Sequence, residues 1–75
     1  MPQASSELYD FAMKKFGTID CGVIHKWLLD TGNWVNLGGG CLGYRGAFKD
    51  LSEDEQKAAY FLVDEWDYGY GPASP

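Results

Sequence analysis

Long apolar segments and a cysteine framework are both missing from this 75-residue sequence. Its apolar runs, such as Ala58–Val63, are far shorter than the roughly 20 residues that a membrane-spanning helix needs. The first ten residues have neither a basic start nor an apolar centre, so they do not resemble a secretory signal. Two cysteines allow at most one disulfide, and free thiols are the expected state. We therefore expect a protein of the bacterial cytoplasm with no membrane association.

The chain is also too short for several domains. A domain typically holds roughly 100–200 residues, so residues 1–75 are predicted to form one small domain, with loose tails at 1–4 and 71–75. The 45% apolar and 16% aromatic content excludes a disordered or collagen-like chain. A large self-contained enzyme does not fit in this length, and we expect neither a cofactor nor a bound metal.

Basic residues are few, six against eleven acidic ones, which gives a formal net charge of −5. The imbalance is local. Residues 1–49 carry four acids and five bases, whereas residues 50–67 carry seven acids and only one base, Lys57. Negative charge opposes phosphate binding by this segment and suits a basic surface on a partner. Simple solubility is the alternative explanation for the acids.

The spacing of apolar residues predicts two helices in the N-terminal part of the chain. The first is capped by Ser5 or Ser6 and stopped by Gly17, since serine caps a helix start and glycine readily ends a helix. The second begins at Thr18 or Asp20. Each has one apolar face, formed by Leu8, Phe11, Ala12 and Phe16 in the first helix and by Val23, Ile24, Trp27 and Leu28 in the second.

Glycine dominates the middle of the chain, where six of the ten glycines lie between residues 32 and 46. The short segments 33–37 and 41–45 are rich in aromatic and β-branched residues, and three consecutive glycines, 38–40, separate them. Because glycine adopts positive φ at little cost, this pattern predicts a β-hairpin with a glycine turn. Residues 38–43 also match the dinucleotide-binding pattern G-x-G-x-x-G. A dinucleotide site, however, needs a βαβ unit that this chain is too short to hold.

A third helix is predicted to carry most of the acidic segment. Ser52 and Glu55 match the S-x-x-E capping box, and the apolar face that follows holds Ala59, Leu62, Val63 and Trp66. Gly69 is expected to end this helix and to leave residues 70–75 uncovered. The element order is then α-α-β-β-α, an α+β fold in which the hairpin and three helices share one core.

The end of this third helix interleaves acids with aromatic residues. Clustered acids complement a basic partner, and aromatic side chains anchor protein interfaces. Acids near a helix C-terminus also oppose the helix dipole, at about a few tenths of a kcal/mol each, which indicates another reason for them. Together with two acids that open the helix, they form the predicted partner-binding set: Glu53, Asp54, Asp64, Glu65, Trp66, Asp67, Tyr68 and Tyr70.

Aromatic residues are more numerous than so small a core can bury, since twelve of the 75 residues are Phe, Trp or Tyr. Exposed aromatic residues usually mark a contact site. A partner or a homodimer would cover them. Five are expected to be partly exposed: Trp34, Tyr44, Phe48, Tyr68 and Tyr70.

Cys21 and His25 lie one helical turn apart, which suits a metal pair or a thiol with its base. The dipeptide Asp20-Cys21 at a helix start resembles papain-like peptidases of the NlpC/P60 type, which implies a cysteine nucleophile. The later histidine of that family has no counterpart here, and zinc would need four ligands. We therefore expect a structural cysteine and no enzyme.

Residues 12–28 resemble the helix-turn-helix of small DNA-binding regulators, with Gly17 at the turn and the predicted hairpin as a wing. The resemblance implies that the second helix enters the major groove by its first residues. Residues 18–22 contain no Arg, Gln or Asn that could read base edges, and few basic residues are available for phosphates. Direct nucleic-acid binding is therefore an alternative to protein binding.

The leading hypothesis is a small, acidic, non-enzymatic binding protein that inhibits a larger protein. In size, acidity and aromatic content the chain resembles phage-encoded inhibitors such as anti-CRISPR, anti-restriction and DNA-mimic proteins. That resemblance implies that the acidic segment covers a basic, nucleic-acid-binding surface of the partner. A helix-turn-helix regulator is the first alternative, and an accessory or structural subunit is the second.

Overall fold

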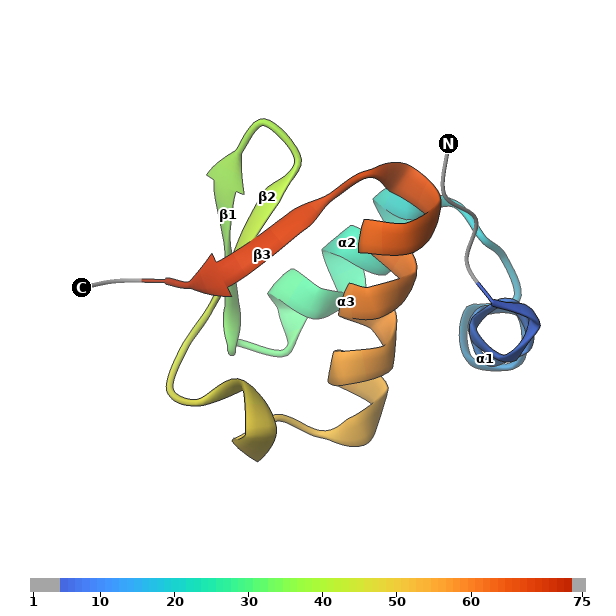
Figure 1. The fold of residues 1–75 in the computed structure, drawn as a ribbon, viewed down its shortest axis with the longest axis horizontal. Helices are drawn as coiled ribbons and strands as arrows, with labels where there is room; N and C mark the ends of the chain where they lie inside the picture. The colour runs from blue at the N-terminus through green and yellow to red at the C-terminus, as the bar shows by residue number, and fades with distance from the viewer. Residues whose placement is uncertain (1–4, 74–75) are drawn as a thin grey trace.

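The computed structural model, which describes residues 5–73, confirms the α+β class and the predicted order of helices and hairpin. The helices are α1 (Ser6–Phe16), α2 (Cys21–Asp30) and α3 (Glu53–Trp66). The strands are β1 (Trp34–Gly38), β2 (Cys41–Tyr44) and β3 (Gly69–Pro72), and a short 3-10 helix, η1 (Phe48–Asp50), precedes α3. Figure 1 shows α3 between α1 and the sheet, with β3 running from the end of α3 back to β2.

Each helix begins at a predicted capping residue, whose side chain accepts a hydrogen bond from a first-turn backbone N–H at 2.7–3.3 Å; the caps are Ser5, Asp20 and Ser52. Gly17 ends α1 with φ of 70°, as predicted. The prediction for the end of α3 is wrong, because the helix stops at Trp66 and not at Gly69. Asp67 takes the left-handed conformation there, with φ of 57°, which aspartate tolerates better than most residues.

The sheet has the strand order β1-β2-β3. Strands β1 and β2 form the predicted antiparallel hairpin, and the turn glycines 38–40 all have positive φ. Strand β3 pairs in parallel with β2, and Leu42 lies opposite Tyr70 in the backbone register. The prediction of an uncovered C-terminal tail is therefore wrong for residues 70–72. Of the loose tails predicted at 1–4 and 71–75, residues 1–4 and 74–75 lie outside the described residues.

The core lies where α3 meets α1, α2 and the sheet. Its buried apolar residues are Ala12, Ile24, Leu28, Trp34, Leu42, Leu51, Ala58, Ala59, Phe61 and Leu62. Two residues predicted to face inward do not: Val23 is 46% exposed and Trp66 is 40% exposed. The prediction that Trp34 is partly exposed is also wrong, since this residue is buried against Tyr44 and Phe48.

Candidate functional site

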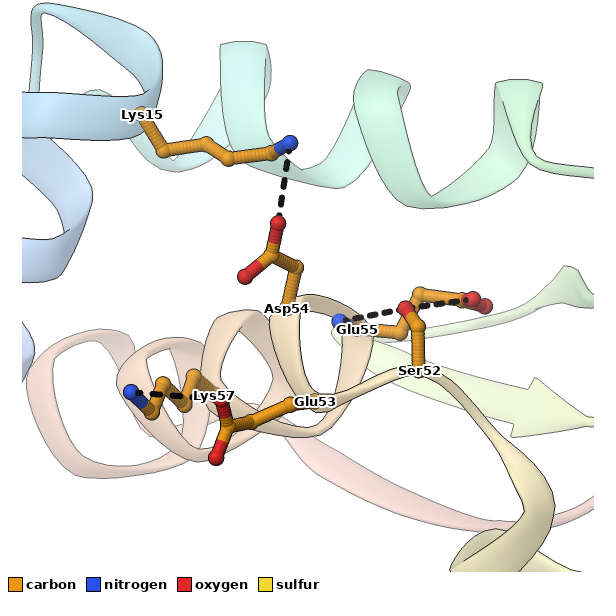
Figure 2. Close-up of polar contacts among 6 residues, drawn as sticks. All are labelled: Lys15, Ser52, Glu53, Asp54, Glu55 and Lys57. Atoms are coloured by element: carbon orange, nitrogen blue, oxygen red, sulfur yellow. Dashed lines mark hydrogen bonds and ion pairs between the residues drawn. The ribbon is translucent and has the colours of Figure 1, made fainter.

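The structure separates the predicted partner-binding set into two groups at opposite ends of α3. Glu53 and Asp54 lie at its start, whereas Asp64, Glu65 and Trp66 lie in its last turn, about 15 Å or more away at 1.5 Å per residue. Asp67 caps the helix, and Tyr68 and Tyr70 follow it, with Tyr70 in β3. Figure 2 shows the first group, in which the Asp54 carboxylate points toward the side chain of Lys15 and lies 3.1 Å from its Nζ. Glu53 lies 4.0 Å from the Lys57 Nζ. These two acids therefore pair with lysines of their own chain.

Glu55, the third acid of the first turn of α3, is buried and ties the helix to β1. Its carboxylate accepts hydrogen bonds from the Ser52 hydroxyl at 2.9 Å, the Trp34 indole N–H at 2.9 Å and the Asn33 amide at 3.2 Å. Burial acts to raise the pKa of Glu55, but these hydrogen bonds outweigh it and hold the pKa below its usual value. The capping box predicted from Ser52 and Glu55 is thus confirmed at the helix start (Figure 2). Through Trp34 the same carboxylate also ties the helix to the sheet.

Three members of the predicted set at the other end of α3 contact the rest of the molecule. Glu65 accepts a hydrogen bond from the Tyr9 hydroxyl of α1, which raises the pKa of Tyr9. The Trp66 indole N–H donates to a backbone carbonyl of the α1–α2 loop at 3.2 Å. The Tyr68 hydroxyl lies 3.3 Å from the His25 Nδ1 on α2. These contacts give Glu65, Trp66 and Tyr68 a role in holding α1 and α2 to the end of α3.

Tyr70 belongs to a group of four neighbouring rings that come from four elements, which we call the aromatic surface: Tyr44 of β2, Phe48 of η1, Tyr60 of α3 and Tyr70 of β3. Tyr70 stacks on Phe48, with 5.0 Å between ring centroids and 14° between ring planes. Tyr60 contacts both rings, at 5.7 and 6.2 Å. Tyr60 and Tyr70 are 41% and 36% exposed, so the group is partly open to solvent.

Asp64 places a negative charge beside this aromatic surface. It follows Tyr60 by one helical turn, so the two side chains emerge on the same face of α3. Burial raises the pKa of Tyr70, and the neighbouring tyrosines and Asp64 raise it further. Asp67 is exposed three residues later. Within residues 5–73, no lysine or arginine nitrogen lies within 4.0 Å of either carboxylate.

The predicted pair of Cys21 and His25 gains a third neighbour, Tyr68. Burial raises the pKa of Tyr68, and the nearby Cys21 adds to this effect. The His25 Nε2 is buried and has no hydrogen-bond partner in the described part of the chain. Both cysteines are free. Among residues 5–73, no group of three or more His, Cys, Asp and Glu side chains is placed to hold a metal ion, and no helix is long and apolar enough to cross a membrane.

The two helices of the predicted helix-turn-helix both pack against α3. They also meet through Phe16 and Trp27, whose ring centroids are 5.3 Å apart. The start of α2, which would enter a DNA groove, presents the Asp20 carboxylate as its cap. Lys15 and Lys26 are engaged in ion pairs with acids of the chain. This face therefore offers little free positive charge for phosphates.

An open groove of about 410 Å³ lies between α1 and α3. The Lys15–Asp54 ion pair is part of its wall. Acids and lysines are equally represented in its lining, so the groove has no preference for a ligand of one charge. Its lining residues are Glu7, Asp10, Phe11, Lys14, Lys15, Asp54 and Lys57.

Comparison with known proteins finds no relative of this chain. A scan against protein-family models finds no match, and searches of curated proteins and of solved structures find none either. The chemistry of the surface is thus the available guide to function. Its most distinctive part is the aromatic surface, where exposed tyrosine rings adjoin a carboxylate that has no ion-pair partner among the described residues.

Proposed function

We propose that this protein is a small, non-enzymatic binding protein that attaches to a basic surface of a larger protein through the aromatic surface and the adjacent Asp64, with the exposed Asp67 at the end of α3 adding negative charge. The observation that supports the proposal is the exposure of Tyr60 and Tyr70 beside Asp64. Exposed aromatic residues that adjoin one another are unusual on a protein that has no partner. The other acids of the predicted set, Glu53, Asp54 and Glu65, are not part of this surface.

The aromatic surface is suited to tight binding because its rings are held in place before a partner arrives. Tyr70 is stacked on Phe48, and Phe48 in turn lies against the buried Trp34 at 6.4 Å. An interface residue that is already ordered loses less conformational entropy on binding. Tyrosine is also among the residues that most often dominate binding energy at interfaces.

The negative charge of the chain favours a basic partner. The net charge is −5, and neither Asp64 nor Asp67 is paired with a lysine or arginine of residues 5–73. Complementary charge speeds association and selects among partners. Basic surfaces commonly serve nucleic-acid binding, so the proposed mechanism of inhibition is occlusion, in which this protein and a nucleic acid compete for one surface.

Affinity capture from a bacterial lysate, with and without nuclease, tests this proposal when it includes surface variants. Tyr60→Gln changes an exposed side chain of the proposed surface, and Asp64→Asn removes the charge of a half-buried one beside it. Met13→Gln is a matched control for an exposed apolar residue, and Glu53→Gln is a matched control for an acid on the same helix. Far-UV circular dichroism of every variant checks that the fold is kept.

The expected result is a stoichiometric protein partner that survives nuclease treatment, is displaced by added oligonucleotide and is lost with the two surface variants only. Three results would contradict the proposal. One is capture that is equal for surface variants and controls. Another is capture of nucleic acid itself, released at moderate salt, which would support a DNA-binding regulator. The third is self-association through the aromatic surface, which sedimentation would detect as a homodimer.

A further inference from the structure

The chemistry of the aromatic surface also indicates which side chain of a partner would bind there, if the proposed function is correct. We infer that this surface recognises an arginine side chain of the partner, whose guanidinium group stacks on the exposed rings of Tyr60 and Tyr70 and pairs with the Asp64 carboxylate. Because a single side-chain type is involved, short peptides can test this site before any partner is known.

The two rings offer a surface of the right kind for a planar cation. Their centroids are 6.2 Å apart and their planes are inclined by 61°, so a guanidinium group stacked on one ring meets the edge or face of the other. Both tyrosine residues keep more than a third of their surface exposed. A cation within about 6 Å of an aromatic ring centroid is attracted by the ring's electron density.

Asp64 supplies the counter-charge at the right place. It lies one helical turn beyond Tyr60, where side chains on a helix are neighbours at about 5–6 Å between Cβ atoms. No lysine or arginine of the described chain lies within 4.0 Å of it, so the carboxylate is available to a cation from outside. Two further oxygens, the hydroxyls of Tyr60 and Tyr70, can accept hydrogen bonds from a guanidinium group.

Arginine fits this arrangement better than lysine does. Its guanidinium group is planar, stacks on aromatic faces, is weakly hydrated and can bind a carboxylate through two parallel N–H groups. The lysine of α3, Lys57, lies 4.0 Å from Glu53 and over the ring of Phe11, so it is not paired with Asp64. The α3 side, with Tyr60 and Asp64, is therefore the side expected to receive a positive group, and an acidic ligand would be repelled there.

Nuclear magnetic resonance titrations of the intact protein test the inference with three blocked tripeptides. Their central residue is arginine, lysine or citrulline, and citrulline keeps the shape of arginine without its charge. The readout is the chemical shift of the Tyr60 and Tyr70 ring carbons at low salt. Asp64→Asn is the test variant, and Glu53→Gln removes the same charge from the other end of the same helix.

The expected result is weak, saturable binding of the arginine peptide at these two rings, about two- to fivefold tighter than the lysine peptide, with no binding of the citrulline peptide. Asp64→Asn should weaken the arginine peptide about threefold, and Glu53→Gln should leave its affinity unchanged. Equal affinity for arginine and lysine, an equal effect of both variants, or shifts centred on other residues would overturn the inference.

The outcome can be separated from that of the proposed function. If a protein partner is lost with Tyr60→Gln but the arginine peptide does not bind these rings, the arginine assignment is wrong and the protein-binding function stands. If the arginine peptide binds these rings but no partner depends on them, the proposed function is wrong and the arginine site stands as a local property of the surface.

Discussion

Replacing Glu55 by alanine tests whether this buried carboxylate holds α3 to the sheet. The variant removes the acceptor of three hydrogen bonds and leaves the indole N–H of Trp34 buried, since that residue is only 2% exposed. A buried donor without a partner costs about 1–3 kcal/mol, and each hydrogen bond to a charged group contributes about 1.5–3 kcal/mol. We therefore expect Glu55→Ala to lower the free energy of unfolding by about 2–4 kcal/mol.

This loss would be a large share of the stability of so small a protein. At about 0.05–0.15 kcal/mol per residue, a chain of 75 residues unfolds with about 4–11 kcal/mol. Urea unfolding followed by far-UV circular dichroism measures the change without relying on a tryptophan close to the substitution. Glu53→Ala is the control, since it removes an exposed acid from the same helical turn. A Glu55→Ala variant within about 0.5 kcal/mol of this control would refute the assigned role of Glu55.

The same carboxylate gives the fold a defined dependence on pH. The pKa of Glu55 is lower in the folded state than its ordinary value of 4.5, so its ionised form is stabilised by folding. Its contribution is therefore complete above pH 4.5 and is lost as the pH falls through the lowered pKa. The stability difference between the natural protein and Glu55→Gln should shrink below pH 4.5. A difference that stays constant down to strongly acidic pH would contradict this assignment.

Three further predictions follow from other contacts. Gly43→Ala should lower the midpoint of thermal unfolding, because the new Cβ would lie 2.8 Å from the Ala73 backbone. Gly71→Ala is the control, since its Cβ would meet open space, and equal midpoints of the two variants would contradict the strand packing. Tyr9→Phe should lower the thermal midpoint by removing the hydrogen bond to Glu65, without changing partner affinity, and an affinity loss at unchanged stability would place Tyr9 in the interface. Finally, the association rate with the partner should fall as salt rises, and a salt-independent rate in stopped-flow measurements would exclude charge steering.

Local signals in the sequence predicted the start of each helix and the hairpin turn. Ser5, Asp20 and Ser52 cap the helices with side chains that bond within their own first turn, so no distant contact is needed. The turn glycines 38–40 all use the positive φ that the run of glycines implied. These features depend on neighbours in sequence, and for that reason they could be predicted.

Features that depend on distant residues were not predictable in the same way. Strand β3 contains two glycines and a proline, so it lacks the alternation that marks a strand, and it forms because β2 offers it a free edge. Which acids are bonded within the chain depends on residues far away in the sequence, such as Tyr9 for Glu65 and Lys15 for Asp54. Tyr60 lay outside the predicted apolar face of α3 and was missed as part of a site. Its spacing of four residues from Asp64 was the available signal.

The affinity of the captured partner for matched double variants tests the central proposal most directly. The surface variant combines Tyr60→Gln with Asp64→Asn, and the control combines Met13→Gln with Glu53→Gln, so each loses one exposed apolar group and one negative charge. We expect the surface variant to bind at least about tenfold more weakly, as for loss of an interface hot spot, and the control to bind as the natural protein does. Equal affinities of the two variants would show that the aromatic surface is not the binding site.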